Sequence, residues 1–298
     1  MYDDPLSQKK FGLSSILREK YSIPKWLPIN AEIQHGWYPS NTFFQNPKIS
    51  KNKRQLVWSD RMMNACRKSG IKHYYCIGSP FVHYRQKYNI EKKNDAKGTV
   101  VFPQHSSEGW NVEVDWIEFI TKLKKLEEEF QPITICLYHL DYINVDVRSQ
   151  FANHFKVVTA GNIYSADFVK NFYRILSSHK YATSNTISTF SFYSTEMGVP
   201  FFLTAQEFSY THKFDSTKIG TGYKEWKASA DSEFSNAHKI FPDYPIKNIS
   251  PAQIEYVDRE LGIRSESSRH ILWLVLFFSG LKVLIKLSLK ELITYFKK

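Results

Sequence analysis

The sequence predicts an α/β protein with two halves, each built on a parallel sheet, followed by a C-terminal amphipathic helix. From residue 98 onward, short runs rich in β-branched and aromatic residues alternate with segments of helical period. These pairs recur about every 20 to 35 residues, which is the spacing of βα units in a parallel sheet. The chain has 298 residues, of which 42% are hydrophobic, with seven Trp and 22 Phe. It is therefore long and apolar enough for two domains with sizeable cores.

In the C-terminal half, the alternation predicts a parallel sheet flanked by helices. The first strand is the run TVVFP, and the second is ITICLY. Strands are expected at 99–103, 133–138, 156–160, 181–183 and 200–204, and helices at 114–130, 145–154, 165–177 and 187–197. Beyond residue 204 the sequence becomes a loop rich in Thr, Lys and Gly, and two more helices are expected at 224–238 and 251–261.

The N-terminal half is smaller and less regular. Strands are expected at 31–34, 55–58 and 73–77, and a helix at 60–69. The polar, basic segment YNIEKKNDAK, residues 88–97, has the composition of a linker between the halves. We therefore expect three units, which cover residues 1–97, 98–262 and 263–298.

The C-terminal segment combines an apolar run with regularly spaced lysines. The run ILWLVLFFSGL, residues 271–281, is shorter than the about 20 residues that span a bilayer. Lys282, Lys286 and Lys290 then recur every four residues, and residues 262–298 hold seven Lys or Arg against two Glu. This pattern predicts an interfacial helix that contacts an anionic membrane surface through residues 270–298. The alternative is a helix docked on the protein core.

Composition excludes several classes of protein. The net charge of +11 suits phosphate-bearing partners, but the basic residues are spread along the chain and no helix-turn-helix, zinc-finger or RNP signature occurs, so no nucleic-acid partner is expected. The three cysteines are odd in number and lack metal-ligand spacing, which favours a reducing cytoplasm. No signal peptide is recognisable at the N-terminus. No P-loop, GxGxxG or DxD motif occurs, so neither a metal nor another cofactor is expected.

Polar residues follow each predicted strand of the C-terminal half. In parallel sheets, ligands bind outside the carboxyl ends of the strands. The polar residues at these five ends are Gln104 to Glu108, His139 and Asp141, Gly161 and Asn162, Ser184 to Thr189, and Gln206 and Glu207. Turn residues and helix caps have similar compositions, which is the structural alternative.

The densest group of these polar residues follows the fourth strand. Ser184, Asn185, Thr186, Ser188 and Thr189 lie where the strand leads into the next helix. Free backbone N–H groups at a helix N-terminus bind anions, and one hydroxyl suffices for a cap. We therefore predict a diphosphate contact here, with a purely structural cap as the alternative.

Two histidines are candidate catalytic residues. His105 follows the first strand and precedes Ser106 and Ser107, so it is placed to contact a leaving phosphate or to transfer a proton. Gly161, which follows the third strand, is a further candidate at the phosphate-binding edge. His35, in the motif QHGWY, follows the first N-terminal strand and would face this edge from the other half, which makes it the candidate base. A structural role is the alternative for both histidines.

The phrases QHGWY, LVWSDRM, IGSPFVHY, VVFPQHSSE, VVTAG and YATSNTISTFSFYSTEMGVPFFL, in this order, resemble bacterial surface-polysaccharide glycosyltransferases of the GT-B-like kind, which have two Rossmann-like halves. The resemblance covers most of residues 30–210. It implies an acceptor-side N-terminal half and a C-terminal half that binds a nucleotide-sugar donor through Ser184, Asn185, Thr186 and Ser188, with His105 near the donor phosphate. The acceptor would be a growing glycan of a capsule or lipopolysaccharide, free or lipid-linked, and the enzyme would be cytoplasmic and peripheral at the inner membrane.

The sequence departs from this family in two respects. The N-terminal half is short for a complete Rossmann domain, and His105 is followed by Ser106 rather than by the proline of the His-Pro motifs in several sialyltransferase groups. The sequence therefore leaves the identity of the nucleotide-sugar donor open. Two alternatives to a glycosyltransferase are a CDP-polyol phosphotransferase of the same type of pathway and a non-catalytic scaffold of a polysaccharide assembly complex.

Overall fold

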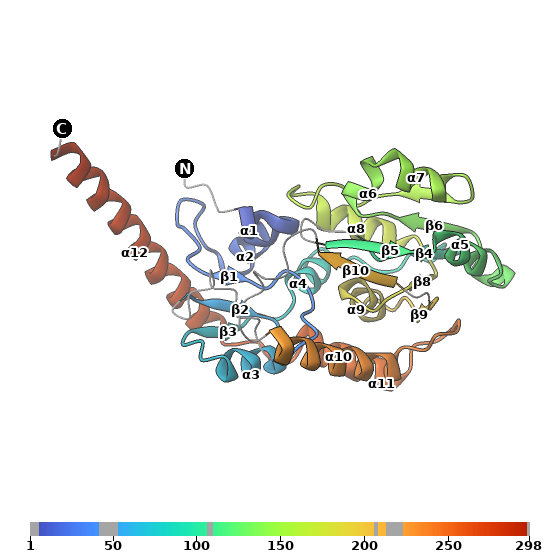
Figure 1. Cartoon of the computed structure of the whole chain (residues 1–298). Coiled ribbons are helices and arrows are strands. Elements are labelled where there is room, and N and C mark those ends of the chain that lie inside the picture. Colours follow the sequence, from blue (N-terminus) through green and yellow to red (C-terminus); the bar gives the residue numbers. More distant parts are fainter. Residues whose placement is uncertain (1–5, 42–52, 106–109, 206–207, 213–222, 297–298) are drawn as a thin grey trace.

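A larger and a smaller parallel sheet, both flanked by helices, form the body of the molecule, and a long C-terminal helix extends away from it (Figure 1). The computed structural model describes residues 6–41, 53–105, 110–205, 208–212 and 223–296. This architecture confirms the predicted α/β class, the parallel sheets and the C-terminal helix.

The larger sheet has five parallel strands in the order β7-β6-β4-β8-β9. β6 and then β7 lie on one side of the central strand β4, and β8 and then β9 lie on its other side. Thr99 of β4 is therefore in register with both Ile133 of β6 and Tyr181 of β8. The order therefore reverses between β4 and β8, where parallel sheets form a crevice for ligands. The strands are β4 Thr99–Val101, β6 Ile133–Cys136, β7 Lys156–Val158, β8 Tyr181–Ser184 and β9 Phe201–Leu203.

Four helices of this half, α5, α7, α8 and α9, lie where the sequence predicts them, whereas the short helix α6 was not predicted. α8 shows why: Val169, Phe172, Tyr173 and Leu176 recur at helical spacing, and all four are buried. The helices are α5 Trp116–Lys124, α6 His139–Ile143, α7 Val145–Ala152, α8 Phe168–Ser177 and α9 Thr189–Glu196, with a 3-10 turn at Glu128–Phe130. The helix predicted from residue 114 instead begins at Trp116, capped by the Asp115 carboxylate.

A two-stranded antiparallel ribbon was not predicted. β5 Trp110–Val114 pairs with β10 Phe208–His212, so that Val114 is in register with Phe208. Nearly one hundred residues separate these segments. Local periodicity carries no information about such a distant partner, so the sequence predicts no strand here and assigns only Val114, the last residue of β5, to the following helix.

The smaller sheet contains three parallel strands, β1 Glu32–Ile33, β2 Gln55–Val57 and β3 Tyr74–Cys76, as predicted. Ser59 caps the predicted helix α3 Asp60–Lys68 by accepting a hydrogen bond from the Met62 N–H. Three further helices were not predicted. They are α1 Leu6–Lys9, α2 Leu13–Tyr21 and α4 Pro80–Lys87, the last of which begins with a proline at its first turn.

The two halves share one hydrophobic core. Its largest cluster joins Leu17, Trp58 and Phe81 of the N-terminal half to Phe102 and Tyr193 of the C-terminal half. The helices α10 Tyr223–Ile240 and α11 Pro251–Leu261 follow, and α11 packs on both α9 and α3. The predicted arrangement of two separate Rossmann-like domains is therefore not confirmed, because one continuous core links the two sheets.

The C-terminal helix α12, Arg269–Phe296, is longer than the apolar run in the sequence. Its segment Arg269–Leu289 has a mean hydropathy of 2.0 and is, by length and composition alone, long and apolar enough to cross a membrane. Lys282 and Lys286 follow the apolar run 271–281 without ending the helix. The run is therefore part of a longer apolar helix, and the expectation that the C-terminal segment is too short to span a bilayer is wrong as far as its length is concerned. Leu272 and Leu276 belong to the shared core, so the first turns are docked on the protein.

Candidate functional site

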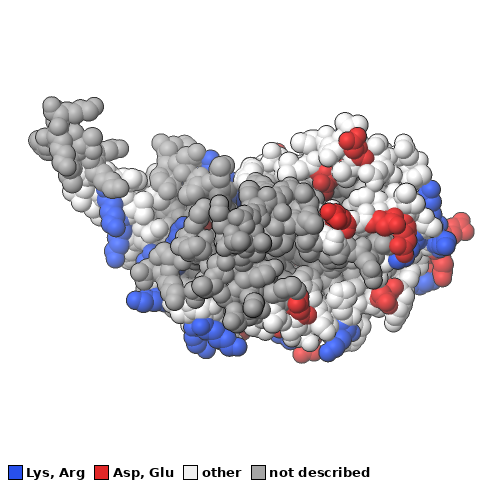
Figure 2. All heavy atoms as spheres, in the orientation of Figure 1, with Lys and Arg blue, Asp and Glu red and all other residues white. Residues whose placement is uncertain are grey.

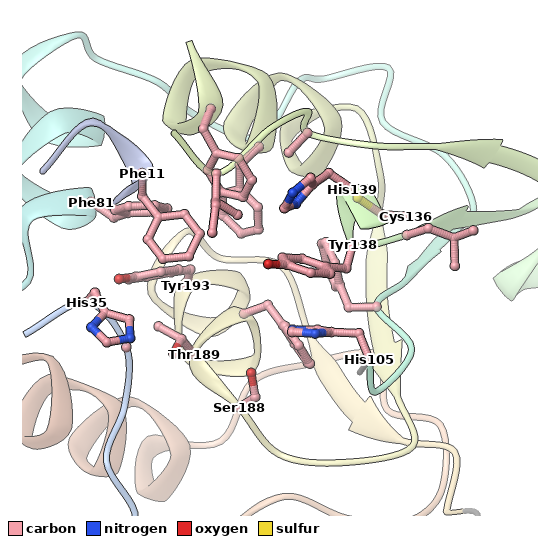
Figure 3. Close-up of a pocket in the computed structure, with 18 of the residues that line it drawn as sticks. Phe11, His35, Phe81, His105, Cys136, Tyr138, His139, Ser188, Thr189 and Tyr193 are labelled. Carbon is pink, nitrogen blue, oxygen red and sulfur yellow. The ribbon is translucent and has the colours of Figure 1, made fainter. Parts of the chain in front are cut away.

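A cavity of about 340 Å³ lies between the two halves, at the carboxyl ends of the larger sheet (Figure 3). On the side of the larger sheet it is lined by residues that follow β4, β6 and β7 and by the beginning of α9. The opposite wall comes from the N-terminal half and includes Lys10, Phe11, His35 and Phe81. The cavity thus occupies the crevice expected where the strand order reverses.

Aromatic rings form most of the cavity wall. Phe81 and Tyr193 stack face to face, with ring centroids 4.9 Å apart. The remaining rings include Phe11, Phe102, Tyr138, Phe168, Phe172 and Phe190. Few polar side chains interrupt this surface, namely Lys10, His35, His105, His139, Ser188 and Thr189. Such a wall suits a ligand with a planar or apolar part and a small number of polar groups.

His35 reaches this cavity from the loop after β1, as predicted. Burial, together with the charge of Lys10, lowers the pKa of His35 to about 4, so its imidazole is neutral near pH 7. Its Nδ1 lies 3.1 Å from the Tyr38 hydroxyl, whose pKa burial raises to about 12. In the tautomer whose Nδ1–H donates to Tyr38, Nε2 is free to accept a proton.

His105 lines the opposite side of the cavity, also as predicted. Its ring stacks on that of Tyr138, with centroids 4.1 Å apart and planes inclined by 15°. One ring follows β4 and the other follows β6, so neighbouring strands position the pair (Figure 3). Ser106 and Ser107, predicted as phosphate contacts, lie outside the described residues.

Ser188 and Thr189 bring the N-terminus of α9 to the cavity wall. The Ser188 N–H donates to Ser191 Oγ at 3.2 Å, which satisfies one amide of the first turn. Thr189 Oγ1 accepts a hydrogen bond from the Trp37 N–H at 2.9 Å, so it also fastens the loop of His35 to the C-terminal half. These two predicted residues therefore combine access to the cavity with a structural role.

Ser184, Asn185 and Thr186 are buried and do not line the cavity. Ser184 Oγ donates to the Phe102 carbonyl at 2.5 Å and accepts from the Thr186 N–H at 3.2 Å. Asn185 Oδ1 accepts from the Gln104 N–H at 2.8 Å. These bonds tie the loop after β8 to the loop after β4, which is the structural alternative to a phosphate contact. The number of hydroxyl residues in this segment predicted a phosphate contact, but the sequence does not show whether each hydroxyl faces the cavity or the interior.

Gly161 also stands behind the cavity wall. Its neighbours Ala160 and Ile163 line the cavity, but Gly161 itself does not. Its φ is +94°, while a Cβ at this position would meet nothing within 4 Å. The glycine is therefore required by the backbone of this turn rather than by close approach of a ligand.

Several lining residues were not predicted. Phe11 enters the cavity wall from a turn in which its own φ is +56° and its N–H donates to the Ile163 carbonyl. The sequence does not distinguish Tyr138 and Tyr193 as site residues, because an aromatic residue at the end of a strand or inside a helix is ordinarily part of a core. Among these wall residues, His139 is the polar residue that follows a predicted strand.

A buried network holds the loop that carries His35. Glu260 Oε2 accepts hydrogen bonds from Trp37 Nε1 and Arg61 Nε, both at 2.8 Å. Arg61 also donates to the carbonyls of Tyr38 and Ser40, each at 2.8 Å. Helices α3 and α11 thereby fix residues 37–40 from both halves of the molecule.

Within the described part of the chain, no group of three or more His, Cys, Asp or Glu side chains is placed to hold a metal ion. The polar groups of the cavity wall are instead imidazoles, hydroxyls and one lysine. Comparison of the chain with protein-family models, with curated proteins and with solved structures finds no match.

Proposed function

We propose that this protein is a glycosyltransferase that moves a sugar from a nucleotide-sugar donor to a growing, lipid-linked surface glycan. The observation that carries the proposal is the position of the cavity. It lies where the strand order of the larger sheet reverses, and the other half closes it with a neutral histidine. A ligand bound there touches both halves, which suits a reaction between two substrates.

The donor would occupy the side of the cavity formed by the larger sheet. The ring pair of His105 and Tyr138 offers a flat surface for a nucleobase, since aromatic rings stack on any base. The amides of the first turn of α9 and the Ser188 hydroxyl would receive the phosphates, with Lys10 supplying a positive charge at the opposite wall. Ser184, Asn185 and Thr186 would support this site from behind.

His35 would act as the base. The acceptor hydroxyl would lose its proton to Nε2 of His35 while its oxygen attacks the anomeric carbon of the donor sugar. The bond between that carbon and the phosphate oxygen then breaks, and the nucleotide, a nucleoside mono- or diphosphate according to the donor, leaves with the bonding electron pair. The N-terminus of α9 would stabilise the negative charge that develops on the leaving phosphate. We place this reaction in the cytoplasm, at the inner membrane, where lipid-linked glycans are extended.

A thermal-shift assay with CMP, CDP, UDP and GDP tests this proposal. A ligand at 100 times its Kd adds about 2.7 kcal/mol to the free energy of unfolding, which raises the Tm by roughly 5 °C in a chain of this size. One of the nucleotides is expected to give this shift, and Tyr138→Ala should abolish it. Leu140→Ala is the matched control, because Leu140 is 39% exposed, lies two residues away and does not line the cavity. Failure of all four nucleotides to raise the Tm would refute the proposal and favour a scaffold.

A further inference from the structure

The positive charge of the chain is concentrated in the N-terminal half and the C-terminal segment. Residues 1–97 contain 18 Lys and Arg against seven Asp and Glu, whereas residues 98–262 contain 15 against 20. Residues 263–298 contain seven against two. The net charges are +11, −5 and +5, so Lys and Arg occur in all three parts of the chain but the excess of positive charge lies in the first and the third. In Figure 2, Lys and Arg appear over α12 and α3, while the C-terminal half shows Asp and Glu together with some Lys and Arg.

Helix α12 has two opposite apolar faces. Leu272, Leu276, Ser279 and Gly280 are buried against the body of the protein. A Cβ on Gly280 would lie 2.6 Å from the Pro28 carbonyl oxygen, so the glycine permits close contact between α12 and the segment before β1. Roughly half a turn away around the helix lies an exposed stripe of large apolar residues. It consists of Ile271, Leu274, Phe278, Ile285 and Leu289, each between 46% and 59% exposed.

This apolar stripe is long and has basic residues beside it. From Ile271 to Leu289 it spans 19 residues, whose 18 rises of 1.5 Å extend about 27 Å along the helix. Lys282 and Lys286 are exposed and lie next to the stripe when residues are placed at 100° intervals. Trp26, 51% exposed, precedes the Leu27 and Pro28 that contact Gly280. Exposed tryptophan beside lysine is the composition of a surface that meets lipid headgroups.

From the charge distribution and the apolar stripe together, we infer that the N-terminal half and α12 form a docking surface for an anionic lipid bilayer. α12 would lie in the plane of the headgroups with the apolar stripe in the lipid and Lys282 and Lys286 at the phosphates. The negative charge of the C-terminal half would turn that half away from the membrane. This inference concerns a surface outside the cavity and does not depend on the proposed reaction.

The packing of α12 argues against a spanning orientation. Because Leu272, Leu276, Ser279 and Gly280 are buried against the protein, lipid cannot surround the first turns of the helix. The remaining residues 281–296 extend about 24 Å, less than the about 30 Å of a hydrocarbon core, and they include Lys282 and Lys286. The same packing makes deletion of residues 270–298 a poor test, because it would remove Leu272 and Leu276 from the core.

Co-flotation of the full chain with vesicles tests the inference. The protein is expected to float with phosphatidylcholine vesicles that contain 30% phosphatidylglycerol, and less with pure phosphatidylcholine. The double variant Leu274→Gln/Phe278→Gln should lower the partition coefficient at least tenfold without changing the Tm, since both side chains are exposed. The matched control is Ile117→Gln/Ile143→Gln, which alters two exposed apolar residues of the C-terminal half and should bind as the unaltered chain does.

Three outcomes would overturn the inference. The first is equal binding of the stripe variant and the control variant. The second is a protein that does not bind vesicles but forms a dimer, with Leu274→Gln/Phe278→Gln dissociating that dimer. This result would show that the stripe contacts a second copy of the chain. The third is retention of the protein in vesicles after washing with carbonate at high pH, which would indicate a spanning helix. None of these outcomes bears on nucleotide binding in the cavity, so they are separable from the proposed function.

Discussion

Replacing Glu260 by alanine is expected to destabilise the protein strongly and to loosen the segment that carries His35. The Glu260 side chain has no exposed surface, and it pairs with Arg61, whose side chain is 11% exposed, at 2.7 Å. Removal of the carboxylate leaves the guanidinium buried without its ionic partner and Trp37 Nε1 without its acceptor. Loss of one partner of a buried ion pair costs about 3–5 kcal/mol. The assay is chemical unfolding followed by tryptophan fluorescence.

The same helix supplies the control for Glu260→Ala. Asp258 pairs at 3.1 Å with Arg264, whose side chain is 84% exposed, and such surface pairs contribute about 0–1 kcal/mol. Asp258→Ala should therefore change the free energy of unfolding little. The double variant Arg61→Met/Glu260→Leu should recover part of the stability lost in Glu260→Ala, because no unpaired charge stays buried. Equal destabilisation by Glu260→Ala and Asp258→Ala would refute the argument that this network holds the two halves together.

Three further predictions concern the pH response, the polar strand ends and the C-terminal helix. Burial depresses the pKa of His35 from 6.5 to about 4 in the folded protein. As the pH drops from about 6.5 towards 4, the unfolded chain therefore takes up a proton that the folded protein does not, and the free energy of unfolding falls. His35→Gln should flatten this dependence in unfolding titrations. Ser184→Ala should cost about 1–2 kcal/mol of unfolding free energy by leaving the Phe102 carbonyl without its partner. Ser188→Ala removes a side chain of the α9 capping box and should cost a similar amount, but it should also lower nucleotide affinity; a larger loss of affinity in Ser184→Ala than in Ser188→Ala would contradict the assigned roles. Leu276→Ala should lower the free energy of unfolding by about 2–5 kcal/mol, and Leu274→Ala should lower it by at most about 0.5 kcal/mol in the same assay. Equal losses would contradict the assignment of Leu276 to the buried face of α12 and Leu274 to the exposed face.

Much of the fold follows from local sequence, because buried parallel strands read as short runs of β-branched residues. Runs such as TVV at Thr99–Val101 and the helical spacing of α8 needed no distant information. The ribbon of β5 and β10 and the contacts of α1 depended on partners far away in the chain, which no local pattern specifies. The shared core was unforeseen for the same reason, since apolar content does not say which helix covers which sheet.

The candidate site was predicted in part. His35, His105, Ser188 and Thr189 reach the cavity because residues after parallel strands gather at one edge of a sheet. Ser184, Asn185 and Thr186 follow the same rule but are buried, because β8 extends to Ser184 and the side chains of Ser184 and Asn185 bond to the neighbouring segment after β4. Lys10 and Phe11 come from a turn whose position depends on tertiary packing, so no signal in the sequence identified them.

Equilibrium binding of a nucleotide-sugar to the cavity tests the central claim most directly. Radiolabelled CMP-, UDP- and GDP-sugars would be dialysed against the unaltered chain, Tyr138→Ala and the control Leu140→Ala. We expect one donor class to bind with one site per chain, to be displaced by its free nucleotide, and to lose at least about tenfold in affinity in Tyr138→Ala, because one stacked ring contributes about 1–3 kcal/mol. Saturable binding that is equal in Tyr138→Ala and Leu140→Ala, or no saturable binding of any donor, would contradict the claim that this cavity holds a nucleotide-sugar.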